Sequence, residues 1–182
     1  TGDRIVDETV PADATGDVGL RRAIEQTVLE AADQNVRSMI IRPGLVYGKG
    51  GSGVMHLFAG LAGQAGGGRT VGDGDNVWSA VHVEDLADLY VAAIERGPTG
   101  TIFHAGTEDE VSMRDIAAAV GNALGLEGPV TAWPVDEARA ALGVLADGLT
   151  TNKRISSARA RELLGWNPHR PGVVKETERG SY

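Results

Sequence analysis

The stretch GDVGLRRAIEQTVLEAADQNVRSMIIRPG, residues 16–44, decides the fold class. Its first part has apolar residues at helical spacing, which predicts a helix over residues 16–35. Residues 36–42 contain the apolar run Met39-Ile40-Ile41 and end at Pro43-Gly44, which predicts a short buried strand. A helix that leads directly into a buried strand is typical of α/β proteins.

The same alternation continues along the rest of the chain. We expect helices over residues 54–65, 85–96, 112–124, 134–142 and 156–164, strands over residues 100–105 and 129–133, and short extended pieces between residues 69 and 83. The order predicts an α/β protein with a doubly wound parallel sheet. Because the chain opens on a loop and a helix instead of a strand with its phosphate-binding turn, we expect a fragment in which the sheet is entered halfway.

Composition excludes several classes of protein. The net charge of −8 disfavours nucleic acid as a partner, and the absence of cysteine excludes disulfides and thiolate chemistry. No apolar run approaches the roughly 20 residues that span a bilayer, so we expect no membrane partner and a cytoplasmic location. The four histidines show no paired metal spacing, so we expect no metal.

Four segments taken together resemble the extended or atypical short-chain dehydrogenase/reductase superfamily, of the NAD-dependent epimerase/dehydratase kind. They are RPGLVYG at residues 42–48, GDGD at 72–75 with VHVEDLA at 81–87, GTIFHAG at 100–106 and LGWNP at 164–168. The resemblance implies the C-terminal part of a Rossmann-like domain over residues 1–70. Over residues 71–182 it implies mainly a small α/β substrate-binding cap, with a strand near 100–105 that returns to the sheet.

The resemblance also implies the activity of an NAD(P)-dependent oxidoreductase, epimerase or dehydratase. Such an enzyme exchanges hydride between the nicotinamide of NAD or NADP and a substrate, here a small polar or sugar-like molecule. The half that binds the dinucleotide would be missing, so we expect the fragment alone to be inactive. Proteins of the superfamily pair through the helix that carries their Tyr-x-x-x-Lys motif, which makes a homodimer through residues 16–35 an expectation.

The catalytic pair of the superfamily is replaced. An alignment through Glu25-Gln26 puts Asp17 at the tyrosine position and Arg21 at the lysine position. The tyrosine is the proton donor and the lysine lowers its pKa. Arg21 could still offer a cation to a ribose hydroxyl, but Asp17 cannot deliver a phenolic proton, so the catalytic residues stay unknown. The alternative is a non-catalytic nucleotide- or ligand-binding regulatory protein of the same fold.

The residues that follow the first strand are candidates for cofactor contact. The resemblance identifies Pro43, Gly44, Leu45 and Val46 with the segment whose backbone faces the nicotinamide. The chemistry of the segment fits such a contact, because proline lacks a backbone N–H donor and glycine lets a ring approach the backbone. A plain strand terminus is the other interpretation of this segment.

Aromatic residues and a histidine are the candidates for substrate contact. They are Tyr47, Trp78 and His82, since aromatic and titratable rings suit an organic ligand. Core packing for Trp78 and a structural hydrogen bond for His82 are the alternatives, and Asp85 is expected to cap its helix.

Residues Gly48–Gly53 match the pattern G-x-G-x-x-G. A third hypothesis makes the chain a complete small nucleotide-binding protein through this loop. Six residues separate Gly48 from the apolar run of the preceding strand, whereas the motif requires the turn at once, so we favour a surface loop.

Overall fold

The computed structural model describes residues 2–10, 17–107 and 109–179, with the side chains given from residue 21 onward in the first helix. The helices are α1 (Asp17–Glu30), η1 (Ala31–Gln34, a 3₁₀ helix), α2 (Gly53–Ala65), α3 (Val83–Arg96), α4 (Met113–Ala123), α5 (Val135–Leu142), α6 (Val144–Leu149), α7 (Ala158–Leu164) and α8 (Val173–Glu178). The strands are β1 (Met39–Pro43), β2 (Leu45–Tyr47), β3 (Gly67–Val71), β4 (Val77–His82), β5 (Thr101–Ala105), β6 (Glu110–Ser112) and β7 (Gly128–Trp133).

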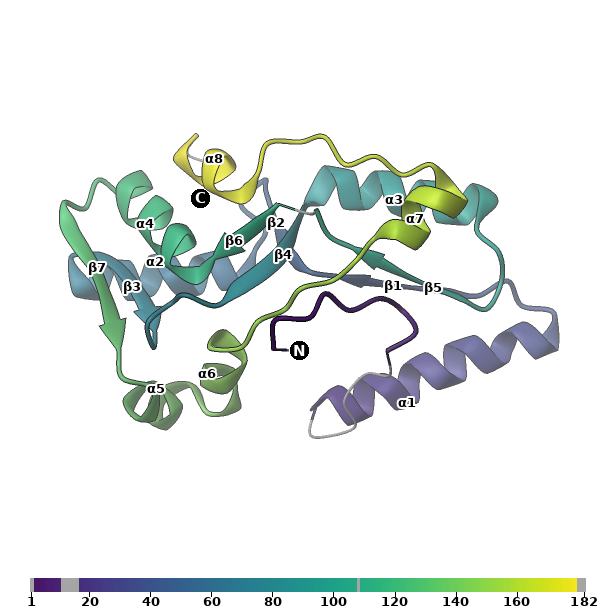
Figure 1. Cartoon of the computed structure of the whole chain (residues 1–182), viewed down its shortest axis with the longest axis horizontal. Helices are drawn as coiled ribbons and strands as arrows, with labels where there is room; N and C mark the ends of the chain where they lie inside the picture. The colour runs from purple at the N-terminus through teal and green to yellow at the C-terminus, as the bar shows by residue number, and fades with distance from the viewer. Residues whose placement is uncertain (1, 11–16, 108, 180–182) are drawn as a thin grey trace.

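Parallel pairing dominates these strands. Strand β1 pairs with β5, β2 with β4 and β3 with β7, all in parallel, whereas β6 is antiparallel to β4. Figure 1 shows α1 on one side of the β1–β5 pair and α3 with α7 on the other, while α2 and α4 lie with β3 and β7 at the opposite end of the molecule. The predicted α/β class is confirmed.

Two buried apolar clusters hold these parts together, and β4 contributes to both. Trp78 and Ala80 belong to a cluster with residues of α2, α4 and α6. Val81 belongs to a second cluster, with residues of α3, β5 and α7. Successive side chains of a strand point to opposite faces, so one strand can take part in two cores.

Glycines allow the close packing of α4 on β3. The sequence GGG at residues 66–68 joins a helix to a strand: Gly66 ends α2 with φ 71° and Gly67 begins β3. A Cβ on Gly68 would lie 2.6 Å from the carbonyl oxygen of Ala117 in α4. Only glycine tolerates that approach of a helix to a strand.

Several element boundaries differ from the sequence prediction. The first strand begins at Met39 and not at residue 36, because Asn35 ends the preceding helical segment in a left-handed conformation with φ 61°. Strands β2 and β6 and helices α6 and α8 were not predicted. Each is six residues long or shorter, and none was recognised from a periodic pattern or an apolar run in the sequence.

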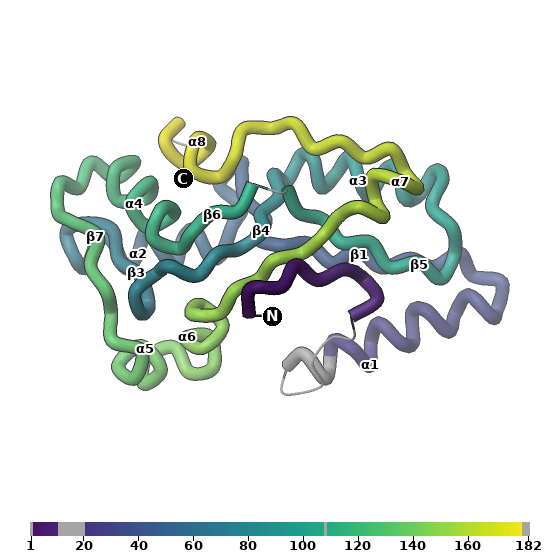
Figure 2. The backbone as a smooth tube through the Cα atoms, viewed as in Figure 1, coloured from purple at the N-terminus to yellow at the C-terminus, as the bar shows by residue number. Residues whose placement is uncertain are grey.

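The N-terminal segment pairs with the segment that leads into α7. Figure 2 shows the N-terminal segment, in purple, running beside the segment that leads into α7. Val6 bridges Ile155 in parallel: the N–H of Val6 donates to Arg154 O at 3.0 Å, and the N–H of Ser156 donates to Val6 O at 2.8 Å. The C-terminal segment also pairs with β4, through a parallel bridge between Trp78 and Lys153.

Candidate functional site

An open cavity of about 830 Å³ lies where these segments meet. Its walls come from the N-terminal segment, α1, the end of β1 with β2, the loop before α2, and residues 153–155. A cavity of this size is within the range of small-molecule and cofactor sites. Segments far apart in the sequence therefore form one surface.

Six of the residues selected from the sequence line this cavity. They are the five candidates for cofactor contact and one candidate for substrate contact: Arg21, Pro43, Gly44, Leu45, Val46 and Trp78. Asp17, the residue at the tyrosine position, has a side chain outside the described part of the structure.

The position of Arg21 depends on an ion pair of Glu25, which lies one turn further along α1. Arg42 of β1 donates two hydrogen bonds to Glu25 of α1, from Nε to Oε1 at 2.9 Å and from Nη2 to Oε2 at 2.5 Å. This bidentate geometry fixes α1 against the strand. Residues four positions apart share a helix face, so Arg21 lies on the same side as Glu25 and is exposed toward the cavity.

Gly44 is required by the packing of two strands. Its N–H donates to Ala105 O at 2.9 Å, and a Cβ at this position would lie 2.2 Å from the carbonyl oxygen of Ser79. The turn between β1 and β2 is therefore held against β4 and β5. Pro43 and Leu45 line the cavity on either side of it.

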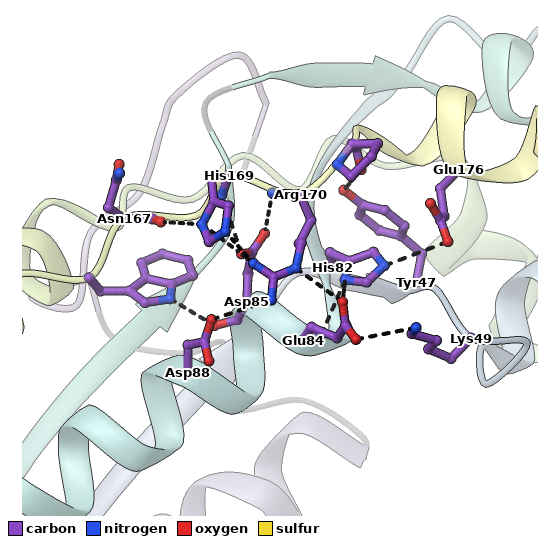
Figure 3. Close-up of polar contacts among 12 residues, drawn as sticks. Tyr47, Lys49, His82, Glu84, Asp85, Asp88, Asn167, His169, Arg170 and Glu176 are labelled. Atoms are coloured by element: carbon purple, nitrogen blue, oxygen red, sulfur yellow. Dashed lines mark hydrogen bonds and ion pairs between the residues drawn. The ribbon is translucent and has the colours of Figure 1, made fainter.

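Tyr47 and His82 lie outside this cavity and pack against each other. Their rings meet edge to face with centroids 5.4 Å apart. The Tyr47 hydroxyl donates to Pro171 O at 2.9 Å, and His82 Nδ1 accepts from the N–H of Glu84 at 3.2 Å, which caps α3 (Figure 3). Tyr47 lines a second cavity, of about 530 Å³.

Asp85 does not cap its helix, contrary to the expectation. His82 is the N-cap, and the buried Asp85 carboxylate instead accepts the backbone N–H groups of His169 and Arg170 at 3.2 and 3.0 Å. The indole of Trp166 donates to Asp85 O at 2.8 Å. The motifs VHVEDLA and LGWNP therefore meet in one structural clamp, shown in Figure 3.

Lys153 is a cavity residue that the sequence analysis did not select. Its Nζ lies 3.7 Å from the centroid of the Trp78 ring. The side chain as a whole is exposed, but the atoms around the ammonium displace part of its hydration. This desolvation and the nearby Arg21 guanidinium lower the pKa of Lys153 to about 8. No motif marks this lysine, because the bridge to β4 that places it is a long-range contact.

His104 is a second cavity residue that was not selected. It is 4% exposed, and its Nδ1 has no hydrogen-bond partner among the described residues. Its backbone N–H donates to Glu8 Oε1 at 2.8 Å. Burial lowers the pKa of His104, against the opposing effect of the Glu8 carboxylate, so the ring favours its neutral form.

The loop at residues 48–53 lies at the cavity edge. The six residues between the apolar run of β1 and Gly48 contain a second strand, β2, which ends at Tyr47, so the loop does follow a strand at once. The first glycine nevertheless faces protein: a Cβ on Gly48 would lie 2.4 Å from His82 Nε2. Ser52 caps α2 by accepting the N–H of Met55, and Gly51 and Gly53 line the cavity.

Within residues 2–10, 17–107 and 109–179, no group of His, Asp and Glu side chains is arranged to hold a metal ion. None of the helices in these ranges has the length and apolar character needed to cross a bilayer.

Comparison with known proteins gives consistent matches. Residues 20–106 match the model of the NAD dependent epimerase/dehydratase family. An uncharacterized protein of Saccharomyces cerevisiae is 35% identical over 158 residues, covering 86% of this chain and 52% of that protein. The UDP-glucose 4-epimerase of Mycolicibacterium smegmatis is 32% identical over 148 residues, covering 76% of this chain and 44% of that enzyme.

A solved structure gives the same picture of the fold. The dTDP-glucose 4,6-dehydratase DesIV of Streptomyces venezuelae, solved with NAD bound, superposes with a TM-score of 0.77 at 18% identity, over the whole of this chain and 54% of that one. The Rossmann-like character predicted for the fold is confirmed. The chain spans about half the length of the curated relatives that it matches.

Proposed function

Because residues 20–106 match the model of the NAD dependent epimerase/dehydratase family, we propose that the chain forms the nicotinamide- and substrate-facing part of an NAD(P)-dependent oxidoreductase, epimerase or dehydratase. The observation that carries the proposal is the 830 Å³ cavity, because it gathers Arg21 and the segment Pro43–Val46 on one surface. These residues were selected from the sequence as the candidates for cofactor contact.

The cofactor in this proposal is NAD or NADP. The nicotinamide would lie along the backbone of Pro43–Val46, and the Arg21 guanidinium would donate to a ribose hydroxyl. The bound cofactor supplies hydride transfer. The phosphates of the dinucleotide would be bound by a segment that corresponds to the half of the relatives that this chain does not match.

The substrate in this proposal is a small polar or sugar-like molecule. The sugar-nucleotide enzyme among the relatives supports that class, and Trp78 offers an apolar surface beside polar groups in the same cavity. We propose that residues 71–182 act mainly as the substrate-binding cap, with β5 belonging to the sheet of the first part. A homodimer through α1 and a cytoplasmic location complete the proposal.

A second candidate is a ligand-binding protein of the same fold without catalysis. The residues at the family's catalytic positions favour it, because an aspartate stands where the proton-donating tyrosine would be. Tight cofactor binding with no turnover of any sugar nucleotide would support this candidate. Oxidation or reduction of the bound cofactor by such a substrate would contradict it.

Isothermal calorimetry with NADH and NADPH tests the cofactor site. We expect no binding by the 182-residue chain and binding once the segment corresponding to the unmatched half of the relatives is supplied. In the protein that binds, Arg21→Gln should weaken binding about tenfold, the loss of one charge-assisted hydrogen bond. Arg22→Gln is the matched control, since Arg22 is an adjacent exposed arginine that does not line the cavity.

Two results would argue against the proposal. Equal effects of the Arg21 and Arg22 variants would remove Arg21 from the site. Tight binding of NADH by the 182-residue chain, abolished by Gly50→Val, would move the phosphate site to residues 48–53 and favour the third hypothesis.

A further inference from the structure

The cavity concentrates positive charge in an acidic protein. Arg21, Arg42 and Lys153 line it, although the chain carries a net charge of −8. One acidic residue, Asp7, lines it as well, and its carboxylate accepts the N–H and hydroxyl of Thr9 at 2.9 and 2.5 Å. An acidic protein that keeps cations in one hollow offers a local site for an anion.

The three cations differ in what they bind. Arg42 donates to Glu25 from two of its three nitrogens, Nε and Nη2, so its charge is compensated. Neither Lys153 nor Arg21 forms an ion pair with a carboxylate in the described part of the chain. The two instead repel each other, because Arg21 contributes to the lowered pKa of Lys153. An anion between them would remove that repulsion.

Lys153 is held where a ligand could reach it. Its backbone is fixed to β4 on both sides: the N–H of Lys153 donates to Val77 O at 2.9 Å, and Lys153 O accepts the N–H of Ser79 at 2.8 Å. The ammonium rests over the Trp78 ring, which restrains a long side chain. The lysine is therefore positioned before a ligand binds, so less side-chain conformational entropy is lost on binding.

From these observations we propose that the ligand of this cavity carries an acidic group, a carboxylate or a phosphate, which Lys153 and Arg21 bind. The Arg21 guanidinium has five N–H donors, enough for this group and for the ribose hydroxyl of the cofactor. The inference rests on the proposed function, because it specifies the substrate of the same cavity. It assigns Lys153 as the residue that selects acidic over neutral substrates.

The test uses the fact that the protein has three lysines, Lys49, Lys153 and Lys175. With ¹³C-labelled lysine, NMR follows the pKa of each ammonium while the full chain is titrated with inorganic phosphate or with acetate, at constant ionic strength. We expect either anion to raise the pKa of Lys153 alone, because a bound negative charge favours the protonated form. The anion that binds more tightly identifies the acidic group.

Substitutions separate a site from general screening. Lys153→Gln should weaken anion binding at least about tenfold, and Lys153→Arg should preserve it. Lys49→Gln is the control of equal charge change, since Lys49 pairs with Glu84 at 3.2 Å outside the cavity. Equal shifts of all three lysines, or unchanged binding by Lys153→Gln, would overturn the inference.

The same titration distinguishes this inference from the proposed function. Anion binding at Lys153, in a protein that still binds no dinucleotide once the segment corresponding to the unmatched half of the relatives is supplied, would sustain the acidic ligand and contradict the dehydrogenase proposal. Dinucleotide binding, with no change in the pKa of Lys153 on addition of either anion, would support the dehydrogenase proposal and contradict the acidic ligand. Phosphate that NADH displaces in direct competition would assign the two cations to the cofactor, and would overturn the substrate assignment.

Discussion

Two polar regions of this molecule use charge in opposite ways. Around the start of α3, Glu84 pairs with Arg170 at 3.0 Å and with Lys49 at 3.2 Å, and the buried Asp85 carboxylate is satisfied by two backbone N–H groups (Figure 3). In the 830 Å³ cavity, Lys153 and Arg21 have no carboxylate partner among the described residues. A saturated network stabilises a fold, whereas unpaired charges beside a hollow leave binding capacity for a ligand.

The largest effect should come from breaking the saturated region. Asp85→Ala leaves the N–H groups of His169 and Arg170 without their acceptor in a buried site, so we expect a loss of about 3 kcal/mol in the free energy of unfolding. Urea denaturation measures it. Asp88→Ala is the control, because Asp88 is 60% exposed and should change stability by less than about 0.5 kcal/mol. Equal losses for the two variants would show that the clamp is not stabilising.

A smaller loss should follow from removing one donor of the same clamp. Trp166→Phe keeps the aromatic packing but deletes the indole N–H that donates to Asp85 O at 2.8 Å. We expect a loss of about 1 to 2 kcal/mol, since a buried carbonyl then lacks its partner. Thermal unfolding monitored by circular dichroism checks the value. No change in the midpoint would mean that water replaces the indole.

The smallest effect on stability should come from the cavity, with the opposite sign. Below pH 8 the folded state holds Lys153 charged despite its lowered pKa, so Lys153→Met should be stabilising, by less than about 1 kcal/mol after allowance for solvent. In the wild type, stability from this group rises between pH 8 and 10.5, as the folded state loses the proton before the unfolded chain does. The difference in the free energy of unfolding between the wild type and Lys153→Met, measured by urea denaturation, should vanish above pH 10.5. A lower free energy of unfolding for Lys153→Met at pH 7 would contradict this prediction.

The contrast also explains what the sequence could predict. Helix α1 has a long periodic pattern, strand β1 has the apolar run Met39-Ile40-Ile41, and the segment Pro43–Val46 follows directly, so this wall of the cavity was predictable. The family motif drew attention to His82, but its burial and its cap of α3 depend on packing with Tyr47 and Glu84. Lys153 lies in no motif and reaches the site only through its pairing with β4, which a pattern of neighbouring residues does not encode.

The bridge between Val6 and Ile155 sets an order of events during synthesis. Contacts between residues far apart in the sequence form late, because the intervening chain must first be brought together. The cavity wall that holds Lys153 therefore closes only after residues 153–155 have emerged from the ribosome. We expect a ligand that needs this wall to stabilise the folded chain and not a nascent chain that ends before it.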